Sequence, residues 1–337
     1  MTMKAILTKL FSGNDLSESE AYSTMNSLMT GQVSAEEVGA FLGSLRTKGE
    51  TVEEIVGCAK SLREHSVPLS LKRTDTIDTC GTGGDGANTF NISTTTAFIG
   101  AAAGFAVCKH GNRSISSQCG SADVLEALEI PIDFGPDQAA KALEQVGYCF
   151  LFAPKYHPAM GNVAPIRRNL GARTIFNLLG PLANPAQTKR QVIGVYDRSK
   201  LLPFAEVLKN LGSENVLLVT GDDGLDEITT TTTTQAVHLR AGTITELTID
   251  PDSYGIKRAK AEELVGGDKS TNAEIIKAIL RGQERGAKRD IVLINAAAAL
   301  LVMEKVDDLK DGIEEARRLL ESGEAWTAFE NIRSFVP

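Results

Sequence analysis

The chain has 337 residues, of which 42% are hydrophobic and 23% charged, a balance typical of a globular protein long enough for one large domain and a small one. No apolar stretch of about 18 residues predicts a membrane span, and the first 16 residues show no signal-peptide pattern. The net charge of −8 argues against non-specific nucleic-acid binding, and any phosphate ligand needs local positive charge or a bound cation.

Cysteine usage predicts the redox environment. The chain has five cysteines, and none of them forms a C-x-x-C pair. An odd number without such pairs is not the pattern of a disulfide framework or of a structural zinc site. Because free thiols persist in reducing compartments, we expect a cytoplasmic location.

Residues 1–70 are predicted to be entirely helical. Gly31 and Gly49 stand where two of the helices should stop. The segment is interpreted as a small helical domain that packs its own core and offers a dimer surface. Three helix starts are indicated by capping boxes, in which a hydroxyl and a glutamate satisfy each other's backbone amides: Ser17-x-x-Glu20, Ser34-x-x-Glu37 and Thr51-x-x-Glu54.

From about residue 74 the pattern changes to short apolar runs that alternate with helix-like segments. This alternation predicts an α/β domain over residues 71–337 with a mostly parallel central sheet. The expected strands are 76–80, 105–109, 191–195 and 215–220, and the expected helices include 123–128, 137–146 and 200–211.

The last third of the chain is predicted to be rich in helix. Thr271-x-x-Glu274 has the form of a capping box, and Asn295-Ala-Ala-Ala-Ala-Leu-Leu is a tightly packable helix. Before it, residues 229–234 are six consecutive threonines. Because threonine favours strands, this run is predicted to be an exposed strand or ribbon without a chemical role.

A glycine-rich loop, Gly81-Thr-Gly-Gly-Asp-Gly86, follows the first expected strand, and Asn91-Ile-Ser-Thr94 has the form of a helix start. A strand, a glycine loop and a helix N-terminus together bind phosphate, because backbone amides and the helix dipole favour negative charge. The loop by itself is equally compatible with a structural turn.

The same loop matches the G-x-G-x-x-G pattern of dinucleotide-binding folds. Those folds need an acidic residue about 20 positions later to bind the ribose, and no acid occurs between Gly86 and Ala122. A nicotinamide cofactor is therefore excluded. The second strand leads instead into Lys109-His-Gly-Asn-Arg-Ser-Ile-Ser-Ser117, which combines two cations with an amide and hydroxyls. Such a loop suits an anion, although a solvated surface loop is the alternative.

Several strings occur together in one order and spacing, from the helical N-terminus to Asn295-Ala-Ala-Ala298. In this the chain resembles the anthranilate phosphoribosyltransferase family. The strings are Gly81-Thr-Gly-Gly-Asp85, Asn91-Ile-Ser-Thr94, Lys109-His-Gly-Asn-Arg113, Gly120-Ser-Ala-Asp123, His157-Pro-Ala-Met160, Arg173-Thr-Ile-Phe-Asn177, Gly180-Pro-Leu182 and Gly224-Leu-Asp-Glu227.

The resemblance implies a Mg²⁺-dependent enzyme of tryptophan synthesis, typically a homodimer joined through its helical domains. It would transfer the phosphoribosyl group of 5-phosphoribosyl 1-pyrophosphate to the amine of anthranilate. The residues implied to hold phosphoribosyl pyrophosphate are Gly81, Gly84, Asp85, Thr89, Asn91, Ile92, Ser93, Thr94, Lys109, His110, Gly111, Asn112, Arg113, Ser114, Ile115, Ser116, Ser117 and Ser121. Those implied for anthranilate are Gly81, Asn112 and Arg167, and those for Mg²⁺ are Ser93, Asp226 and Glu227.

The chemistry implied by the family assigns no catalytic acid or base, because an aromatic amine is neutral at pH 7. Catalysis would rest on positioning and on stabilising the leaving pyrophosphate. Asp226 and Glu227 suit Mg²⁺, which prefers oxygen ligands and keeps several waters. Adjacent residues point apart on a regular element, but on a loop after Gly224 both can turn to one site. An ordinary acidic turn is the alternative.

A basic and aromatic group is implied near the anthranilate. Arg167 would pair with its carboxylate, while Arg168 faces elsewhere because a helix turns by about 100° per residue. For His157, stacking near the aromatic substrate and plain packing both stay open. Arg173 is interpreted as structural, and His110 as shaping the phosphate loop without transferring a proton.

The chain departs from the family pattern at three places. Gly161 follows the His-Pro-Ala-Met string where the family often has Lys or Arg, which concerns the entrance of the anthranilate channel. The segment 220–224 replaces a common His-Gly pair, and the threonine run is unusual. None of these departures removes an implied ligand.

Two other functions fit the sequence less well than this one. A nucleoside phosphorylase of similar architecture would use inorganic phosphate and a nucleoside, but those proteins are longer and vary these loops. A non-catalytic relative that binds nucleic acid should be basic and should lack Asp226, Glu227 or Arg167, whereas this chain is acidic and keeps all three.

Overall fold

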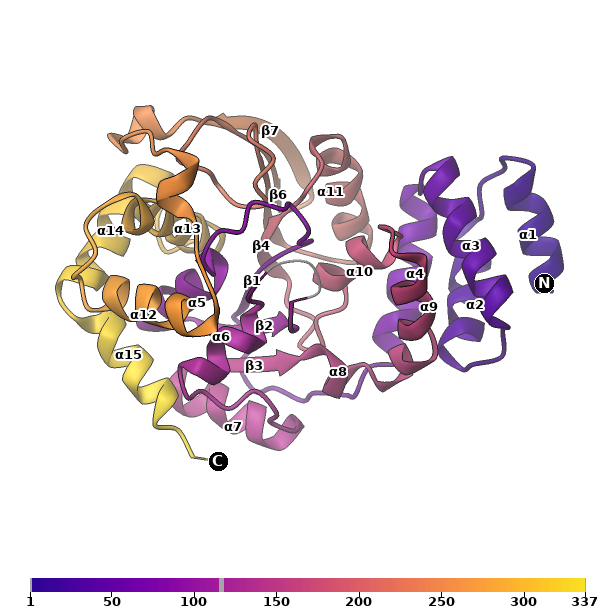
Figure 1. Cartoon of the computed structure of the whole chain (residues 1–337), viewed down its shortest axis with the longest axis horizontal. Coiled ribbons are helices and arrows are strands. Elements are labelled where there is room, and N and C mark those ends of the chain that lie inside the picture. Colours follow the sequence, from indigo (N-terminus) through magenta and orange to yellow (C-terminus); the bar gives the residue numbers. More distant parts are fainter. Residues whose placement is uncertain (1, 115–117, 337) are drawn as a thin grey trace.

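The N-terminal end of the molecule is a layer of helices in the computed structural model, which describes residues 2–114 and 118–336 (Figure 1). In the last three of these helices the predicted capping boxes are confirmed, with both reciprocal bonds present. Gly31 and Gly49 have φ of 70° and 90° at helix ends, so the predicted stops are confirmed as well. The helices are α1 (Met3–Phe11), α2 (Glu18–Met29), α3 (Ala35–Lys48) and α4 (Val52–Glu64).

The centre of the molecule is a seven-stranded sheet in the order β3-β2-β1-β4-β5-β6-β7. Strands β1 to β5 pair in parallel, and β6 and β7 are antiparallel. The predicted fold class, a helical domain followed by an α/β domain with a mostly parallel sheet, is confirmed. The strands are β1 (Thr76–Gly81), β2 (Ala106–Gly111), β3 (Tyr148–Phe152), β4 (Arg190–Gly194), β5 (Asn215–Gly221), β6 (Thr234–Arg240) and β7 (Thr243–Ile249).

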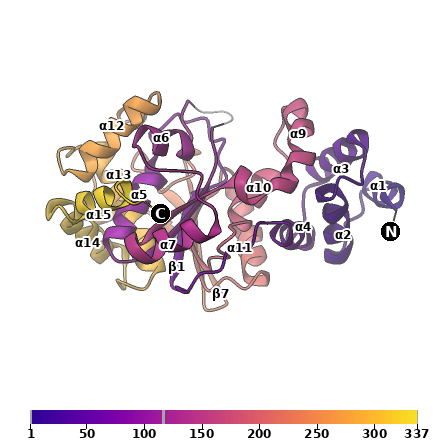
Figure 2. The ribbon, with the colours of Figure 1, turned by 90° about the horizontal axis from the view of Figure 1, so that it is seen from below.

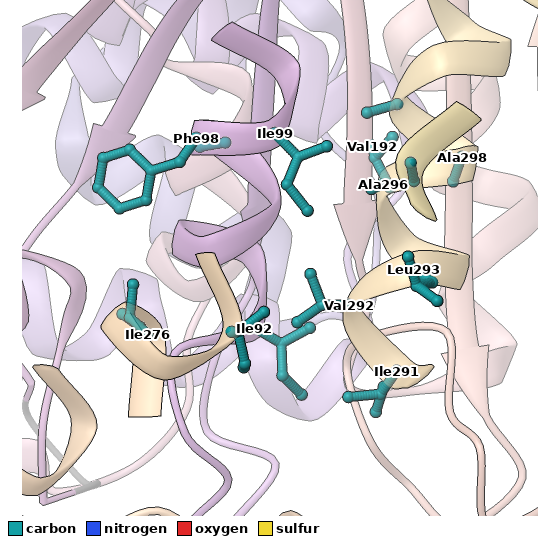
Figure 3. Packing of buried hydrophobic residues seen from close by; sticks show 14 of the residues in the cluster. Ile92, Phe98, Ile99, Val192, Ile276, Ile291, Val292, Leu293, Ala296 and Ala298 are labelled. Atoms are coloured by element: carbon teal, nitrogen blue, oxygen red, sulfur yellow. The ribbon is translucent and has the colours of Figure 1, made fainter. Parts of the chain in front are cut away.

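Helices cover both faces of the sheet because buried strand residues alternate between them. On β4, Val192 packs with the apolar cluster that includes α5 and α13, whereas Ile193 packs with the cluster that includes α4 and α11. Figure 3 shows the first of these clusters, with Phe98 of α5 and Val292 of α13. The helices of the α/β part are α5 (Ile92–Ala102), α6 (Ser121–Ala127), α7 (Pro136–Val146), α8 (Ala153–Tyr156), α9 (Ala164–Leu170), α10 (Phe176–Leu182), α11 (Leu201–Asn210), α12 (Lys269–Leu280), α13 (Ala287–Val302), α14 (Leu309–Glu321) and α15 (Glu324–Arg333).

A later segment of the chain returns to the N-terminal helices. Helix α9 packs on α3, and α10 packs on α4 (Figure 2). The amide of Asn162 donates to the Met29 carbonyl at 2.7 Å, and Arg63 donates to the Leu182 carbonyl at 2.6 Å. The helical end is therefore built from two separate stretches of sequence. Among the described residues, no helix is both long and apolar enough to cross a membrane.

The threonine run is the first of two corrections to the predicted elements. Only Thr234 belongs to a strand, as the first residue of β6, and Thr229, Thr230 and Thr234 are completely buried. Asp223 accepts hydrogen bonds from the hydroxyls of Thr229 and Thr231. These local bonds compete with strand pairing, so the expected exposed strand is a partly buried loop.

The second correction concerns the start of α12. The helix begins at Lys269, and its N-cap is Asp268, whose carboxylate accepts from the amide of Thr271 at 2.8 Å. The predicted capping box at Thr271 is therefore three residues too late, because an aspartate stands at the cap position before it. The predicted helix that contains Asn295 is confirmed as part of α13.

Candidate active site

The candidate site lies where the strand order of the sheet reverses. Strand β1 is flanked by β2 on one side and β4 on the other, and Gly81 and Gly194 are register partners at the carboxyl ends of β1 and β4. Open parallel sheets bind ligands in the crevice at such a switch point. The glycine loop that follows β1 and the start of α5 both lie at this edge of the sheet (Figure 1).

Two glycines let the acidic loop after β5 approach the sheet. A Cβ atom at Gly194 would lie 1.5 Å from the backbone oxygen of Asp226, and one at Gly81 would lie 2.5 Å from its carboxylate. Both distances are far below van der Waals contact, so only glycine allows this approach. Gly194 was missed in the sequence analysis, because only the register of β4 against β1 shows that it faces Gly81.

The three residues implied for the metal are brought together from distant parts of the chain. The amide of Gly83 donates to Oδ2 of Asp226 at 2.8 Å, and the amide of Ser93 donates to Oε1 of Glu227 at 3.0 Å. Asp226 thus faces the glycine loop while Glu227 faces the start of α5. The two adjacent acids turn to one site because they lie on a loop. Each bond occupies one carboxylate oxygen, and the other oxygen of each group is able to ligate a cation.

Negative charge accumulates in this site. Burial, together with the charges of Asp85 and Glu227, holds the pKa of Asp226 well above its ordinary range. Burial also raises the pKa of Glu227 to about 7, although Lys109 opposes the shift. A divalent cation would relieve this repulsion. Among the described residues no group of three or more His, Cys, Asp or Glu side chains is arranged to hold a metal ion.

Lys109 lies beneath the site, with only 2% of its surface exposed. Its ammonium group donates to the carbonyl of Thr79 and to the hydroxyl of Ser93, the latter at 3.4 Å. Burial lowers its pKa, and the acids Asp78 and Glu227 oppose that shift. Lys109 therefore supplies positive charge from below Ser93, a position that the sequence did not indicate.

The remaining residues of the glycine loop are held by local bonds. Asp85 accepts from the amide of Ala87 at 3.2 Å, and Thr89 forms an isolated bridge with Val265. The side chain of Asn91 donates to the Cys119 carbonyl at 3.1 Å. These contacts hold the loop ahead of α5, where Ile92 and Thr94 are buried.

The two cations of the second predicted phosphate loop have different surroundings. Lys109 is buried, whereas the guanidinium of Arg113 pairs with Asp123 at 3.0 Å and with Glu126 at 2.6 Å. The side chain of Asn112 accepts from the amide of Arg113 at 2.8 Å. Residues 115–117 of the predicted set lie outside the described residues. The positive charge of Arg113 is thus paired with two acids of α6. The residues of the loop itself did not indicate these partners.

Ser121 closes this loop from the start of α6. Its hydroxyl donates to the carbonyl of Asn112 at 3.3 Å. Gly111 lies at the end of β2, where a Cβ atom would come within 2.3 Å of the Ser121 hydroxyl. The described part of the loop is therefore packed tightly at its base.

Arg167 and Arg168 have different surroundings on α9. The guanidinium of Arg167 lies 4.8 Å from the ring centre of Phe176, and burial lowers its pKa. Arg168 is exposed. Arg167 is therefore the arginine that is turned into the protein, in the register that the resemblance implies. Nothing in this geometry by itself identifies its ligand.

His110 and His157 form a pair beside this region, with ring centres 5.2 Å apart. His110 contacts the Gly180 carbonyl through Nδ1 at 3.2 Å. Both ring nitrogens of His157 are buried and have no hydrogen bond of normal geometry among the described residues. The nearby Ala183 carbonyl favours the protonated ring, but the effect of burial on the pKa of His157 is larger. Burial lowers the pKa of His110 to about 3 and that of His157 to about 4, so both rings are neutral at pH 7.

The buried imidazole of His157 predicts an acid-sensitive fold. Its pKa in the folded state is about 4, below its ordinary value of 6.5, so the unfolded chain binds more protons between these values and stability falls as the pH falls through that window. The free energy of unfolding should fall by about 2 kcal/mol between pH 7 and pH 5 because of this group. We expect His157→Phe to remove this part of the pH dependence. Thermal unfolding curves at pH 8, 7, 6 and 5 check this, and parallel pH profiles for both proteins would contradict it.

Two further residues near the site were not singled out for it. Arg173 donates to the carbonyl of Gly84 and stacks on the ring of Tyr196 at 4.2 Å, so it holds the glycine loop. Asp78 is completely buried in β1, where its carboxylate accepts from Asn184 at 2.8 Å and from the amide of His110 at 3.3 Å. The sequence does contain a signal for Asp78, because it is an acid within the first expected strand, which is otherwise uncharged.

Comparisons with known proteins agree with this architecture. The helical bundle domain of the glycosyl transferase family matches residues 4–66, and its α/β domain matches residues 73–326. The anthranilate phosphoribosyltransferase of Clostridium kluyveri is 50% identical over 98% of this chain and 98% of its own length. That of a Thermoanaerobacter species is 51% identical over 95% of each chain. The chain belongs to the anthranilate phosphoribosyltransferase family.

Solved anthranilate phosphoribosyltransferases share the whole fold. The Thermus thermophilus structure has a TM-score of 0.92 and 41% identity, and the match covers 97% of this chain and 98% of that one. The Saccharomyces cerevisiae enzyme in complex with phosphoribosyl pyrophosphate and Mg has a TM-score of 0.91 and 27% identity, covering 98% of this chain and 96% of that one. The same yeast enzyme has been solved in complex with 4-fluoroanthranilate. The family resemblance drawn from the sequence motifs is thus confirmed.

Proposed function

We propose that this chain transfers the phosphoribosyl group of 5-phosphoribosyl 1-pyrophosphate to the amine of anthranilate. The products are N-(5-phosphoribosyl)anthranilate and pyrophosphate, in a step of tryptophan synthesis. The observation that carries this function is the convergence of the glycine loop, the start of α5 and the acids Asp226 and Glu227 at one end of the sheet. All five cysteines are free, which suits a reducing cytoplasm.

The reaction replaces one bond at C1 of the ribose by another. The bond from C1 to the pyrophosphate oxygen breaks, the bond from C1 to the anthranilate nitrogen forms, and the nitrogen loses a proton. Such a centre passes through a state with oxocarbenium character. The amine is neutral at pH 7, so the work of the protein is to align the two substrates and to stabilise the departing charge.

We assign the phosphoribosyl pyrophosphate site to the two loops that meet at this edge. The family assigns the described residues Gly81, Gly84, Asp85, Thr89, Asn91 to Thr94, Lys109 to Ser114 and Ser121 to it. Support comes from the glycine loop, which Arg173 holds at Gly84, and from the buried ammonium of Lys109 below Ser93. These groups place backbone amides and positive charge where a polyanion is expected.

Ser93, Asp226 and Glu227 would hold Mg²⁺ in this site. Their oxygen donors fit the ion, and the repulsion between the buried carboxylates supports a cation there. Bound Mg²⁺ supplies neutralisation of the charge that develops on the leaving pyrophosphate. The protein contributes the orientation of the donors through the amides of Gly83 and Ser93.

Arg167, Asn112 and Gly81 would bind anthranilate. The guanidinium of Arg167 is planar and suits a carboxylate in two parallel hydrogen bonds. Its stacking on Phe176 and its partial burial support this role, because the group is oriented before the ligand arrives. The neutral imidazoles of His110 and His157 lie in the same part of the molecule and add no competing positive charge at pH 7.

The proposed function is tested by following the fluorescence of anthranilate with purified protein. Loss of the signal should require both phosphoribosyl pyrophosphate and Mg²⁺, and one pyrophosphate should be released for each anthranilate consumed. Consumption of thymidine or uridine with inorganic phosphate, and none of anthranilate, would move the chain to the nucleoside phosphorylases.

The helical part, residues 1–70, is proposed to form a homodimer, while residues 71–337 carry the catalytic site. Phe11 at the end of α1 is 68% exposed, and the groove beside it is lined by small residues of α3, among them Ala40, Gly43 and Ser44. An exposed aromatic ring next to such a groove suits a symmetric interface, in which each copy contributes the same contact.

Sedimentation at micromolar concentration should show a dimer near twice 36.0 kDa. Phe11→Asp should weaken the dimer by roughly 2 kcal/mol for each copy, which raises its dissociation constant by about a thousandfold. Leu202→Asp is the control, because Leu202 is also an exposed apolar residue but lies on α11. This change should leave the dimer intact. A monomeric wild type over this range contradicts the proposal.

A further inference from the structure

Helix α13 contains one polar residue in an otherwise apolar stretch. The residues around Asn295, such as Ile291, Leu293 and Ala298, are buried (Figure 3), and Asn295 itself is 1% exposed. Asparagine is a weaker helix former than alanine or leucine, and a buried amide is costly unless its hydrogen bonds are satisfied. Neither packing nor helix propensity accounts for an asparagine at this position.

The amide of Asn295 is bound almost entirely to one residue outside the helix. Its Oδ1 accepts from the backbone amide of Ile228 at 3.0 Å, and its Nδ2 donates to the Ile228 carbonyl at 2.9 Å. The second Nδ2 hydrogen goes to the carbonyl of Ile291 at 2.8 Å. Both donors and the acceptor are therefore used. The side-chain amide of Asn295 binds both backbone groups of Ile228, as a neighbouring strand would do in a sheet.

Ile228 directly follows Glu227, so its backbone sets where the two acids point. Asp223 accepts from the amide of Leu225, just before the acids, at 3.2 Å, and from the hydroxyl of Thr229, just after Ile228, at 2.7 Å. Asp226 lies against Gly194, where no Cβ fits. The acids thus occupy the middle of a loop whose backbone is fixed before and after them.

We propose that Asn295 is a positioning residue for the metal site, acting through the backbone of Ile228. Within the described part of the chain, its side-chain hydrogen bonds go to Ile228 and Ile291 and not to the acids themselves. By holding the Ile228 amide and carbonyl, it fixes the direction of Glu227 toward Ser93 and keeps Asp226 over Gly83. The inference rests on the proposed function, since it concerns the residues that would hold Mg²⁺. Groups behind metal ligands typically change metal affinity by about tenfold to a hundredfold when they are removed.

The test uses Asn295→Ala in the full-length protein. We expect the Mg²⁺ concentration for half-maximal activity to rise by about tenfold or more, while KM for anthranilate at saturating Mg²⁺ changes less than about twofold. A second readout does not depend on turnover: Mn²⁺ alone is titrated into the protein, and free Mn²⁺ is followed by electron paramagnetic resonance. The variant should bind Mn²⁺ more weakly than the wild type by a similar factor.

Val302→Ala is the matched control, because Val302 is a completely buried residue at the end of the same helix and its apolar side chain cannot hydrogen-bond the backbone of Ile228. It should lower the melting temperature without moving the dependence on Mg²⁺ or Mn²⁺. Should Asn295→Ala not fold, Asn295→Ser decides by the same criteria, since a hydroxyl replaces only one of the two bonds to Ile228. Unchanged metal dependence in the Asn295 variant, or an equal shift in Val302→Ala, overturns the proposal.

Failure of this inference is distinguishable from failure of the proposed function. If Asp226→Ala with Glu227→Ala abolishes activity and Mn²⁺ binding, while Asn295→Ala leaves both unchanged, the metal assignment stands and the positioning role is wrong. If anthranilate is not consumed by the wild type at all, the proposed function is wrong.

Discussion

Replacing both Asp226 and Glu227 by alanine reduces the turnover of anthranilate by about a hundredfold to a thousandfold. This is the scale of the several kcal/mol that a bound metal ion contributes to stabilising transition-state charge. The expectation follows from the geometry, in which the two carboxylates face the glycine loop and the start of α5. Activity is measured in protein treated with EDTA and then titrated with Mg²⁺.

The fold should survive this double change. Both acids are half-buried residues of a loop and do not lie in a core, and the desolvation of their carboxyl groups raises the pKa of both. Removing buried acids whose charged form is disfavoured relieves repulsion at pH 7, and this offsets the loss of the bonds from Gly83 and Ser93. The melting temperature should therefore change little. Asp222→Asn, at an exposed acid of the same loop, serves as control and should keep its activity.

If the double variant keeps near-normal activity across the Mg²⁺ titration, the ligand assignment is wrong. A variant that is inactive and also unfolded by circular dichroism would leave activity uninformative. In that case the single variants Asp226→Asn and Glu227→Gln, which keep the shape of each side chain, decide by the same titration.

Arg167→Ala weakens anthranilate binding by about tenfold to a hundredfold, whereas Arg168→Ala has a small effect. The loss corresponds to roughly 1.5–3 kcal/mol for a hydrogen-bonded pair with a charged group. The structure separates the two arginines: Arg167 stacks on Phe176 and is half-buried, and Arg168 is exposed. Binding of phosphoribosyl pyrophosphate should change little in either variant, because its site is assigned to other loops.

Steady-state titrations with one substrate varied at a time check this pair of variants. If Arg168→Ala weakens anthranilate more than Arg167→Ala does, the assignment along α9 is off by one residue. If both variants spare anthranilate and weaken phosphoribosyl pyrophosphate, the segment belongs to the phosphate site. Arg167→Lys adds a useful comparison, because lysine keeps the charge but cannot make two parallel bonds to a carboxylate.

Local signals in the sequence determined the N-terminal helices and the class of the fold. Capping boxes at Ser17, Ser34 and Thr51 act within three residues, so they formed as predicted. The strands before the two phosphate loops were found because a buried parallel strand is a short apolar run between turn signals. Strand β3 was missed, since its apolar run continues directly into α8 and a short apolar run does not distinguish strand from helix.

Specific side-chain partners decided features that propensity and composition did not predict. The threonines after Ile228 have strong strand propensity, but two of their hydroxyls donate to Asp223 and most of the run forms a partly buried loop. Arg113 is predicted to contribute positive charge to the phosphate site, and the structure adds that two acids of α6, ten and thirteen residues later in the sequence, hold it in ion pairs. Propensity and composition do not contain these partners, because they depend on which segments meet.

The sequence by itself determined the family and the types of residue available for chemistry, because the glycine loop, the basic loop and the acid pair are each contiguous strings. Only the tertiary structure decided how they act together. Gly81 and Gly194 become neighbours through the pairing of β1 with β4, which lets Asp226 approach both strands. Asn295 reaches Ile228 across 67 residues of sequence. Contacts of this kind arise from chain packing, which no local pattern of residues encodes.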